Sequence, residues 1–273
     1  MYRRTFLSLA APAVALPAWF RFGEPHWFEL TRTTLSLPVT KPITLLHVSD
    51  FHTSDGMTAE DLEAGLMLGL KQRPDLICLT GDFVTITKGF DRPGLLRLLR
   101  RAADTAPSFA VLGNHDGGAW LARYGGSDSH RDIGDLVQSA GIRLLHNESA
   151  GCGELTLAGI GDLWSGHAHP RRAFAALPPS PATILLAHNP DAKDMMLPYP
   201  WHLMLSGHTH GGQARIPGIT PPWAPVADKR FLAGLYRWED RQIFVTRGIG
   251  SPKHIRAFCR PEVSLLHIVP FSA

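Results

Sequence analysis

The sequence predicts a layered α/β protein, because short apolar runs of strand length alternate with segments of helical periodicity in its first half. The chain has 273 residues, of which 44% are hydrophobic, so one domain can bury a sizeable core. Glycine (26) and proline (22) predict many loops but fall short of a low-complexity composition. Since no repeat or linker divides the sequence, we expect one domain over residues 41–270, preceded by a separate segment over residues 1–20.

The first twenty residues have the order of parts of an export signal: two arginines, an uncharged stretch from Thr5 to Phe20, and small residues. The stretch is too short, and too interrupted by prolines, for a comfortable membrane span. Arg3–Leu7 resembles the twin-arginine export signal of bacteria, with departures at Tyr2 and Ser8. We expect an exported or membrane-associated protein whose segment is either cleaved or kept as an anchor. The alternative is an ordinary amphipathic first helix.

Apolar runs rich in Ile, Leu and Val, without strict alternation, predict the strands. The runs are Ile43–Val48, Leu76–Leu79, Phe109–Leu112, Leu155–Ile160, Thr183–Ala187, His202–Leu205, Ile243–Val245 and Val263–Val269.

Three segments between the early runs predict helices. A capping box formed by Thr58 and Asp61 would open a helix that runs to about residue 72. Pro93–Ala103 places its leucines on one amphipathic face, and Asp132–Ala140 is followed by Gly141, a common helix stop. By contrast, residues 209–225 are dense in glycine and proline and predict a long functional loop.

Charge argues against a nucleic-acid-binding protein, and cysteine content argues against a cysteine-ligated metal site or a disulfide framework. Lys and Arg number 27 against 24 Asp and Glu, and the arginines occur in short pairs, so no nucleic-acid partner is indicated. Cys78, Cys152 and Cys259 have neither metal-ligand spacing nor the number needed for a disulfide framework. We expect one disulfide at most, and Cys78 to be a small buried hydrophobe.

Five of the predicted strands are followed by residues that can bind metals. They are Ser49-Asp50-Phe51-His52, Gly81-Asp82, Gly113-Asn114-His115-Asp116, Ala187-His188-Asn189 and Ser206-Gly207-His208-Thr209-His210. Because α/β sheets gather their crevice at the carboxyl ends of strands, we expect these side chains to converge. Each segment alone is an ordinary turn. Together, their carboxylate, amide and imidazole groups suit two divalent ions such as Mn, Fe, Zn or Ni.

This order of motifs, D-x-H, G-D, G-N-H-D, H and G-H-x-H, resembles the signature of the calcineurin-like metallophosphoesterase superfamily, and the resemblance covers roughly residues 41–269. It implies a four-layer α/β/β/α sandwich around two central mixed sheets and the hydrolysis of phosphoesters. The stretches Gly207–Gln213, Arg247–Gly250 and Arg260–Glu262 are similar to a branch of exported or membrane-associated bacterial phosphodiesterases. That branch includes a UDP-2,3-diacylglucosamine pyrophosphohydrolase of lipid A synthesis.

The resemblance assigns roles by motif position. One metal would be held by Asp50, His52 and His210, the other by Asn114, His188 and His208, with Asp82 bridging both. His115 would protonate the leaving-group oxygen or stabilise charge on the phosphoryl group, and Asp116 would hold its imidazole. Two cations about 3.5–4 Å apart lower the pKa of a bridging water, which then attacks as hydroxide. Manganese is our first expectation for both ions.

Aromatic residues surround these motifs in the sequence. Trp120 and Tyr124, in the insertion of residues 117–126, are spaced to share a helical face, which favours either core packing or an apolar wall near the substrate. Trp164 and Trp223 lie in other loop-like stretches. A nearby pair, His167 and His169, could add metal ligands, although neither follows an apolar run.

We expect the substrate to be a phosphodiester or a pyrophosphate diester, met outside the cytoplasm or at a membrane surface. The first alternative is the nucleotide-lipid pyrophosphohydrolase, and a phosphomonoesterase is another. The alternative from a different class is a metal-binding scaffold without turnover, against which the complete ligand set argues. Arg247 and Arg256 could contact a second phosphate, or be ordinary surface charges.

Overall fold

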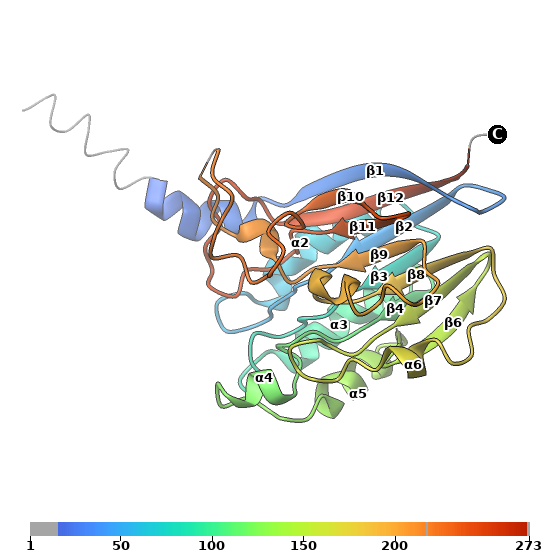
Figure 1. The fold of residues 1–273 in the computed structure, drawn as a ribbon. Helices are drawn as coiled ribbons and strands as arrows, with labels where there is room; N and C mark the ends of the chain where they lie inside the picture. Colours follow the sequence, from blue (N-terminus) through green and yellow to red (C-terminus); the bar gives the residue numbers. More distant parts are fainter. Residues whose placement is uncertain (1–15, 217, 272–273) are drawn as a thin grey trace, which may run out of the picture.

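The computed structural model describes residues 16–216 and 218–271, which form two six-stranded sheets with helices on their outer faces (Figure 1). The first sheet has the order β1 (Glu29–Leu37), β12 (Glu262–Pro270), β2 (Ile43–Val48), β3 (Leu76–Leu79), β4 (Ser108–Ala110) and β5 (Arg143–Leu144). The second has the order β10 (Gly234–Trp238), β11 (Arg241–Val245), β9 (Leu203–Ser206), β8 (Ala182–Leu186), β7 (Leu155–Gly159) and β6 (Glu148–Cys152). Both sheets are mixed, since each combines parallel and antiparallel pairs.

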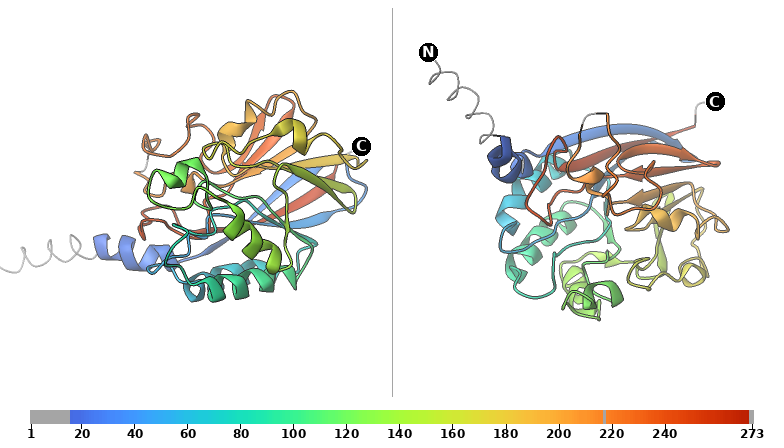
Figure 2. Two further views of the ribbon diagram at one scale, coloured as in Figure 1. Left: turned by 90° about the horizontal axis from the view of Figure 1, so that it is seen from below. Right: turned by 60° about the vertical axis from the view of Figure 1, so that its left-hand side comes forward.

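The layers follow from where the apolar side chains point. One cluster, with members such as Leu45 of β2 and Leu186 of β8, fills the space between the two sheets. A second packs the first sheet against α2 (Ala59–Leu70), α3 (Arg92–Ala103) and α5 (Arg131–Ser139). A third covers the outer face of the second sheet, beneath α6 (Pro170–Ala173) and the short 3-10 turn η3 (Pro190–Lys193). The predicted four-layer α/β/β/α sandwich is therefore confirmed, and Figure 2 shows these layers from two further directions.

The predicted strands and long helices are all present. The helix α2 begins with the predicted capping box, in which Thr58 Oγ1 accepts from the Asp61 backbone N–H at 3.2 Å and the Thr58 N–H donates to the Asp61 carboxylate at 2.9 Å. The short helix α4 (Ala119–Ala122) lies inside the predicted insertion. The cysteines Cys78, Cys152 and Cys259 are all free, and Cys78 is buried as expected.

Four strands escaped the sequence analysis: β1, β5, β6 and β10. The edge strand β1 pairs in parallel with β12, so the first sheet begins upstream of residue 41. Only one edge of β1 is paired and only part of it is buried, so polar residues, among them three threonines, are tolerated along it. Such a strand lacks the continuous apolar run that marks a buried one.

The signal-like motif of residues 1–15 lies outside the described residues. The chain then continues through η1 (Trp19–Gly23) and the 3-10 turn η2 (Glu24–His26), which lie at the end of the sandwich near the loop before β12 (Figure 1). In residues 16–216 and 218–271, none of the helices has both the length and the apolar character needed to cross a membrane.

Candidate metal centre

The carboxyl ends of β2, β3, β8 and β9 bring the predicted metal-binding residues together. One group of ligand atoms within 4.8 Å of one another consists of Asp50, His52 and His210, and a second consists of Asp82, His188 and His208. These are the two sets that the motif positions suggested, apart from Asn114, which lines the same cavity. All are buried.

Asp82 lies between the two groups. Its Oδ2 atom is 3.1 Å from His188 Nε2 of one group and 3.4 Å from His52 Nε2 of the other. On the far side of His52, His210 Nε2 lies 3.4 Å from Asp50 Oδ1. A single carboxylate that reaches both groups is the arrangement needed to link two cations.

The donor set fits divalent cations. His208 Nε2 and the Asn114 side-chain oxygen are buried without a hydrogen-bond partner among the described residues. Imidazole nitrogens also face each other, with His52 Nε2 at 3.1 Å from His210 Nε2. Buried polar atoms are normally paired, so a cluster of unpaired nitrogen and oxygen donors is best explained by an ion that they share.

The electrostatics keep most of the imidazoles in the form that binds metals. Burial lowers the pKa of His208 to about 3 and holds the pKa values of His52 and His210 well below their ordinary range. Burial alone would also lower the pKa of His188, but the adjacent Asp82 carboxylate raises it to about 10. Burial would raise the pKa of Asp82, yet His188 and other imidazoles beside it hold that pKa well below its usual range. Neutral imidazoles and ionised carboxylates are the ligand forms.

Backbone strain is concentrated at the same residues. Asp50, His52, Asp82, His208 and His210 all have φ between 50° and 68°, a region that non-glycine residues seldom occupy. Such conformations cost roughly 1–3 kcal/mol each and persist where surrounding structure demands them. Here the ligand-bearing loops pack closely against one another, which holds these residues in the unfavourable conformation.

Gly207 illustrates that packing. A Cβ atom at this position would collide with the Asp50 carboxylate, so only glycine allows the two loops to approach. The backbone N–H of the next residue, His208, then donates to Asp50 Oδ1 at 3.0 Å.

His115 faces the same centre, as the sequence predicted, but its imidazole is held differently. Its Nδ1 atom donates to the Thr85 carbonyl oxygen at 2.7 Å, and its backbone N–H donates to Asp82 Oδ1 at 2.9 Å. One of its ring nitrogens also lies within 4.8 Å of potential ligand atoms of His52 and Asp82. Thr85, three residues after the Gly81-Asp82 motif, was missed, because a backbone carbonyl leaves no sequence signal.

The predicted role of Asp116 as the partner of His115 is wrong. The buried Asp116 carboxylate accepts from the backbone N–H groups of Asp82 and Phe83, both at 2.8 Å, and of Gly113 at 2.9 Å. It therefore ties two ligand-bearing turns together. Burial and the charge of Asp82 raise its pKa to about 8.

The proposed phosphate contacts of Arg247 and Arg256 are also wrong. Arg247 forms ion pairs of 2.7 Å with Glu262 and with Glu29 at the base of the first sheet. Arg256 is fully buried and donates to backbone carbonyls, including that of His210 at 3.0 Å. Both side chains are occupied in holding the chain around the site.

The insertion forms a wall of the site instead of core. A cavity of about 720 Å³ opens over the metal-binding residues and is lined by Trp120, Tyr124, Trp164 and Trp223. The ring centroid of Trp120 lies 4.5 Å from that of His115, and that of Trp164 lies 4.4 Å from that of His208. The apolar-wall alternative is therefore the observed one.

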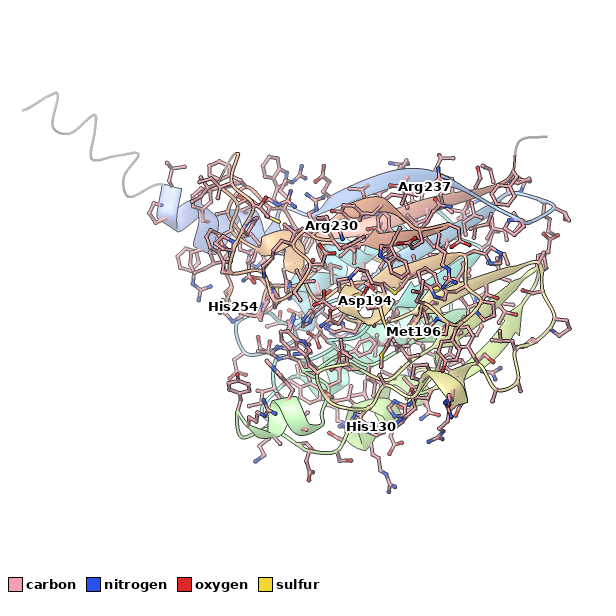
Figure 3. All side chains as sticks on the ribbon, in the orientation of Figure 1. His130, Asp194, Met196, Arg230, Arg237 and His254 are labelled. Carbon is pink, nitrogen blue, oxygen red and sulfur yellow. The ribbon has the colours of Figure 1, made fainter. Side chains whose placement is uncertain are left out.

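The His167–His169 pair lies elsewhere. His167 packs against His130 and His146, with ring centroids 4.6 and 5.8 Å away, and belongs to none of the metal-binding groups in the described part of the chain. Figure 3 labels His130 near α5, at the lower end of the molecule.

Comparison with known proteins agrees with this geometry. The family model of calcineurin-like phosphoesterases matches residues 43–212. Phosphodiesterase YaeI of Escherichia coli K12 is 40% identical over 276 residues, covering 98% of this chain and 99% of that protein. The uncharacterized metallophosphoesterase YkuE of Bacillus subtilis 168 is 29% identical, over 97% of this chain and 96% of YkuE. UDP-2,3-diacylglucosamine pyrophosphatase LpxG of Chlamydia muridarum is 26% identical, over 95% of this chain and 94% of LpxG.

Proposed function

The chain belongs to the calcineurin-like phosphoesterase family and is a phosphoric ester hydrolase, and from this premise we propose that it cleaves phosphodiesters with two divalent ions, first of all manganese. The observation that carries the proposal is the position of Asp82, whose carboxylate lies within 3.4 Å of an imidazole of each group. We assign Asp50, His52 and His210 to one ion, Asn114, His188 and His208 to the other, and Asp82 to both. When bound, such ions polarise phosphoryl oxygens and lower the pKa of a water.

The remaining groups of the site act on the leaving group. Donation of His115 Nδ1 to the Thr85 carbonyl fixes the tautomer, so Nε2 is the nitrogen that can hold a proton for the departing oxygen. Trp120 packs against the same imidazole and limits its rotation. His115 thereby supplies the acid.

The aromatic wall favours a leaving group with a flat or apolar part. Trp120 and Trp164, with ring centroids 6.0 Å apart, border the cavity above His115 and His208. A nucleobase would pack well there. This observation supports a second candidate, the hydrolysis of a nucleotide-lipid such as UDP-2,3-diacylglucosamine, which is the activity in the name of the relative LpxG.

One panel separates these candidates. The full chain, loaded with manganese, is assayed on bis-p-nitrophenyl phosphate, p-nitrophenyl phosphate and UDP-2,3-diacylglucosamine, with Asp82→Asn as the control. Diester hydrolysis that Asp82→Asn abolishes supports the phosphodiesterase, and a strong preference for the nucleotide-lipid supports the second candidate. Preference for the monoester, or no turnover with both ions bound, contradicts the proposal.

We also propose that the protein works in the cell envelope. The support is the signal-like order of residues 1–20, with Arg3 and Arg4 ahead of an uncharged stretch. Replacing both arginines with lysine should keep the protein in the cytoplasm of a bacterial host. Unchanged export of that variant would contradict a twin-arginine route.

A further inference from the structure

Three segments far apart in the sequence form one surface beside the metal-site cavity. We call it the N-terminal face, and it comprises residues 16–27, 213–216 with 218–226, and 248–260. The Arg21 side chain donates to the His254 carbonyl at 2.9 Å, and the Arg215 backbone N–H donates to the Ala257 carbonyl at 2.8 Å. These bonds join the first segment to the third and the third to the second. The face is the end of the molecule at which η1 projects in Figure 2.

This face carries most of the large apolar side chains that are exposed among the described residues. Of sixteen large exposed hydrophobic residues in the described ranges, nine belong to it. Phe22 is 70% exposed, Phe258 is 61% exposed, and Ile219 is 54% exposed. Soluble monomers seldom gather so many exposed apolar side chains in one place, so the patch marks an interaction surface.

Within its three segments, the exposed charges of the face have one sign, while Asp61 and Glu29 at its border lie 3.7 Å from His26 and 3.8 Å from Arg260. Its three segments contain five Arg or Lys residues, of which Arg256 is buried, and a single acidic residue, Glu24. Glu24 is buried and accepts from the Cys259 backbone N–H at 2.6 Å. The exposed part is therefore apolar and cationic. The fifteen residues that precede it in the sequence add two arginines and no acid.

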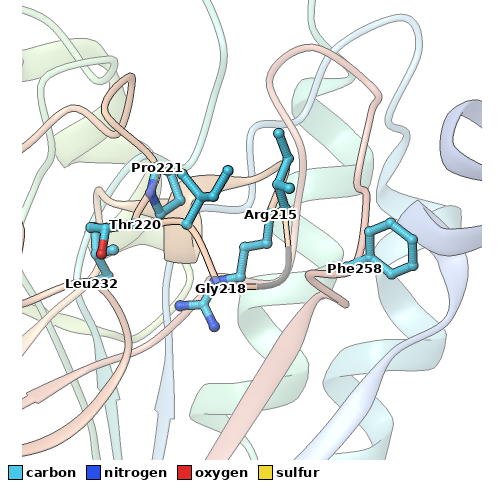
Figure 4. A pocket seen from close by; sticks show the side chains of 8 residues that line it. Arg215, Gly218, Thr220, Pro221, Leu232 and Phe258 are labelled. Atoms are coloured by element: carbon cyan, nitrogen blue, oxygen red, sulfur yellow. The ribbon is translucent and has the colours of Figure 1, made fainter.

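A hollow on the face combines both properties. It measures about 400 Å³ and is lined by Arg215, Ile219, Thr220 and Phe258, among others (Figure 4). A guanidinium and a hydroxyl beside isoleucine and phenylalanine suit a phosphate attached to an acyl chain.

The face also continues into the rim of the metal-site cavity. Trp223, Lys253 and Ile255 belong to both. A surface that docked on a membrane through these residues would place the cavity mouth at the level of the lipid headgroups.

We propose that the N-terminal face docks on the surface of an anionic phospholipid bilayer. Aromatic and aliphatic side chains ringed by Arg and Lys bind such surfaces through apolar insertion and attraction to acidic headgroups. A second copy of the chain would set the same positive charges against one another, which disfavours a symmetric dimer through this face. The inference goes beyond the proposed activity and is independent of it, because binding is measured without turnover.

The test is co-sedimentation of the full chain with vesicles of phosphatidylcholine alone or mixed with phosphatidylglycerol. The test variant is Phe22→Ser/Ile219→Ser/Phe258→Ser, which changes only exposed side chains outside the metal-site cavity. The matched control is Met195→Ser/Leu197→Ser/Leu235→Ser, whose side chains are also exposed. Figure 3 labels the adjacent Met196 well away from His254 of the face. All proteins keep residues 1–15, so a difference between them belongs to the face.

We expect the wild type and the control to bind the anionic vesicles and the test variant to bind about tenfold more weakly or worse. Binding to phosphatidylcholine alone should be weaker, and salt should reduce binding to the anionic vesicles. Equal binding by the test variant and the wild type would overturn the proposal, as would equal binding to both vesicle types. A solution mass of two chains that falls to one in the test variant would assign the face to a second copy instead.

Discussion

Replacing Asp116 with asparagine tests whether this carboxylate builds the site or acts through His115. The wild-type carboxylate accepts from three backbone N–H groups at 2.8–2.9 Å, two on Oδ2 and one on Oδ1. An asparagine keeps only one oxygen. Placed where Oδ2 was, that oxygen still accepts from the Asp82 and Gly113 N–H groups, but the NH₂ group then faces the Phe83 N–H. The Phe83 N–H is then left unpaired, at a cost of about 1–3 kcal/mol, and the longer bond of 3.4 Å from the Val84 N–H to the same oxygen is lost with it.

The expected loss of unfolding free energy is therefore roughly 1–3 kcal/mol. It is measured by urea denaturation of the metal-free chain at about pH 9, above the pKa of Asp116, so that its carboxylate is ionised, with Asp128→Asn, an exposed carboxylate, as the control. Metal content should fall as well, because Asp116 positions the Asp82 turn. A variant as stable as the wild type, with full metal content and only a shifted pH profile of kcat, would show that Asp116 acts on the His115 imidazole and would refute this reasoning.

Three further predictions concern the acid, the wall and a buried histidine. His115→Ala should lower kcat by about 10²–10⁴-fold while elemental analysis finds the metals intact; loss of both metals would contradict its role. Trp120→Leu should raise KM for aromatic diesters by roughly 2–10-fold, and an equal rise for aliphatic diesters would contradict stacking. Burial lowers the pKa of His47 to about 3, whereas the unfolded chain keeps a value near 6.5. Unfolding therefore takes up a proton between these values, and this stabilisation, complete above pH 6.5, is lost as the pH falls toward 3. From about pH 7 to about pH 5 the wild type should lose about 2 kcal/mol more stability than His47→Gln, and equal losses in urea titrations would refute the assignment.

The strands and the metal cluster were predictable because each depends on local sequence. A buried strand needs a continuous apolar run, and a ligand at its carboxyl end needs only to follow that run. β1 escaped because a half-exposed edge strand needs no such run.

The orientation of individual side chains was not predictable, because it depends on neighbours distant in the chain. Asp116 follows His115 directly, yet its carboxylate points toward the backbone of residues 82 and 83. Arg256 reads as a surface charge, yet five carbonyl oxygens, including those of His210 and Gly250, enclose its guanidinium. Both side chains satisfy backbone groups of the ligand-bearing loops, a demand that only the folded structure reveals.

The most direct test of the two-ion assignment is a titration of the metal-free chain with manganese, in which bound metal and hydrolysis of bis-p-nitrophenyl phosphate are followed together. We predict that hydrolysis rises until two ions are bound per chain, and that Asp82→Asn neither holds both ions nor turns over the diester. Full activity with one ion per chain, or undiminished activity in Asp82→Asn, would contradict a centre in which Asp82 joins two ions.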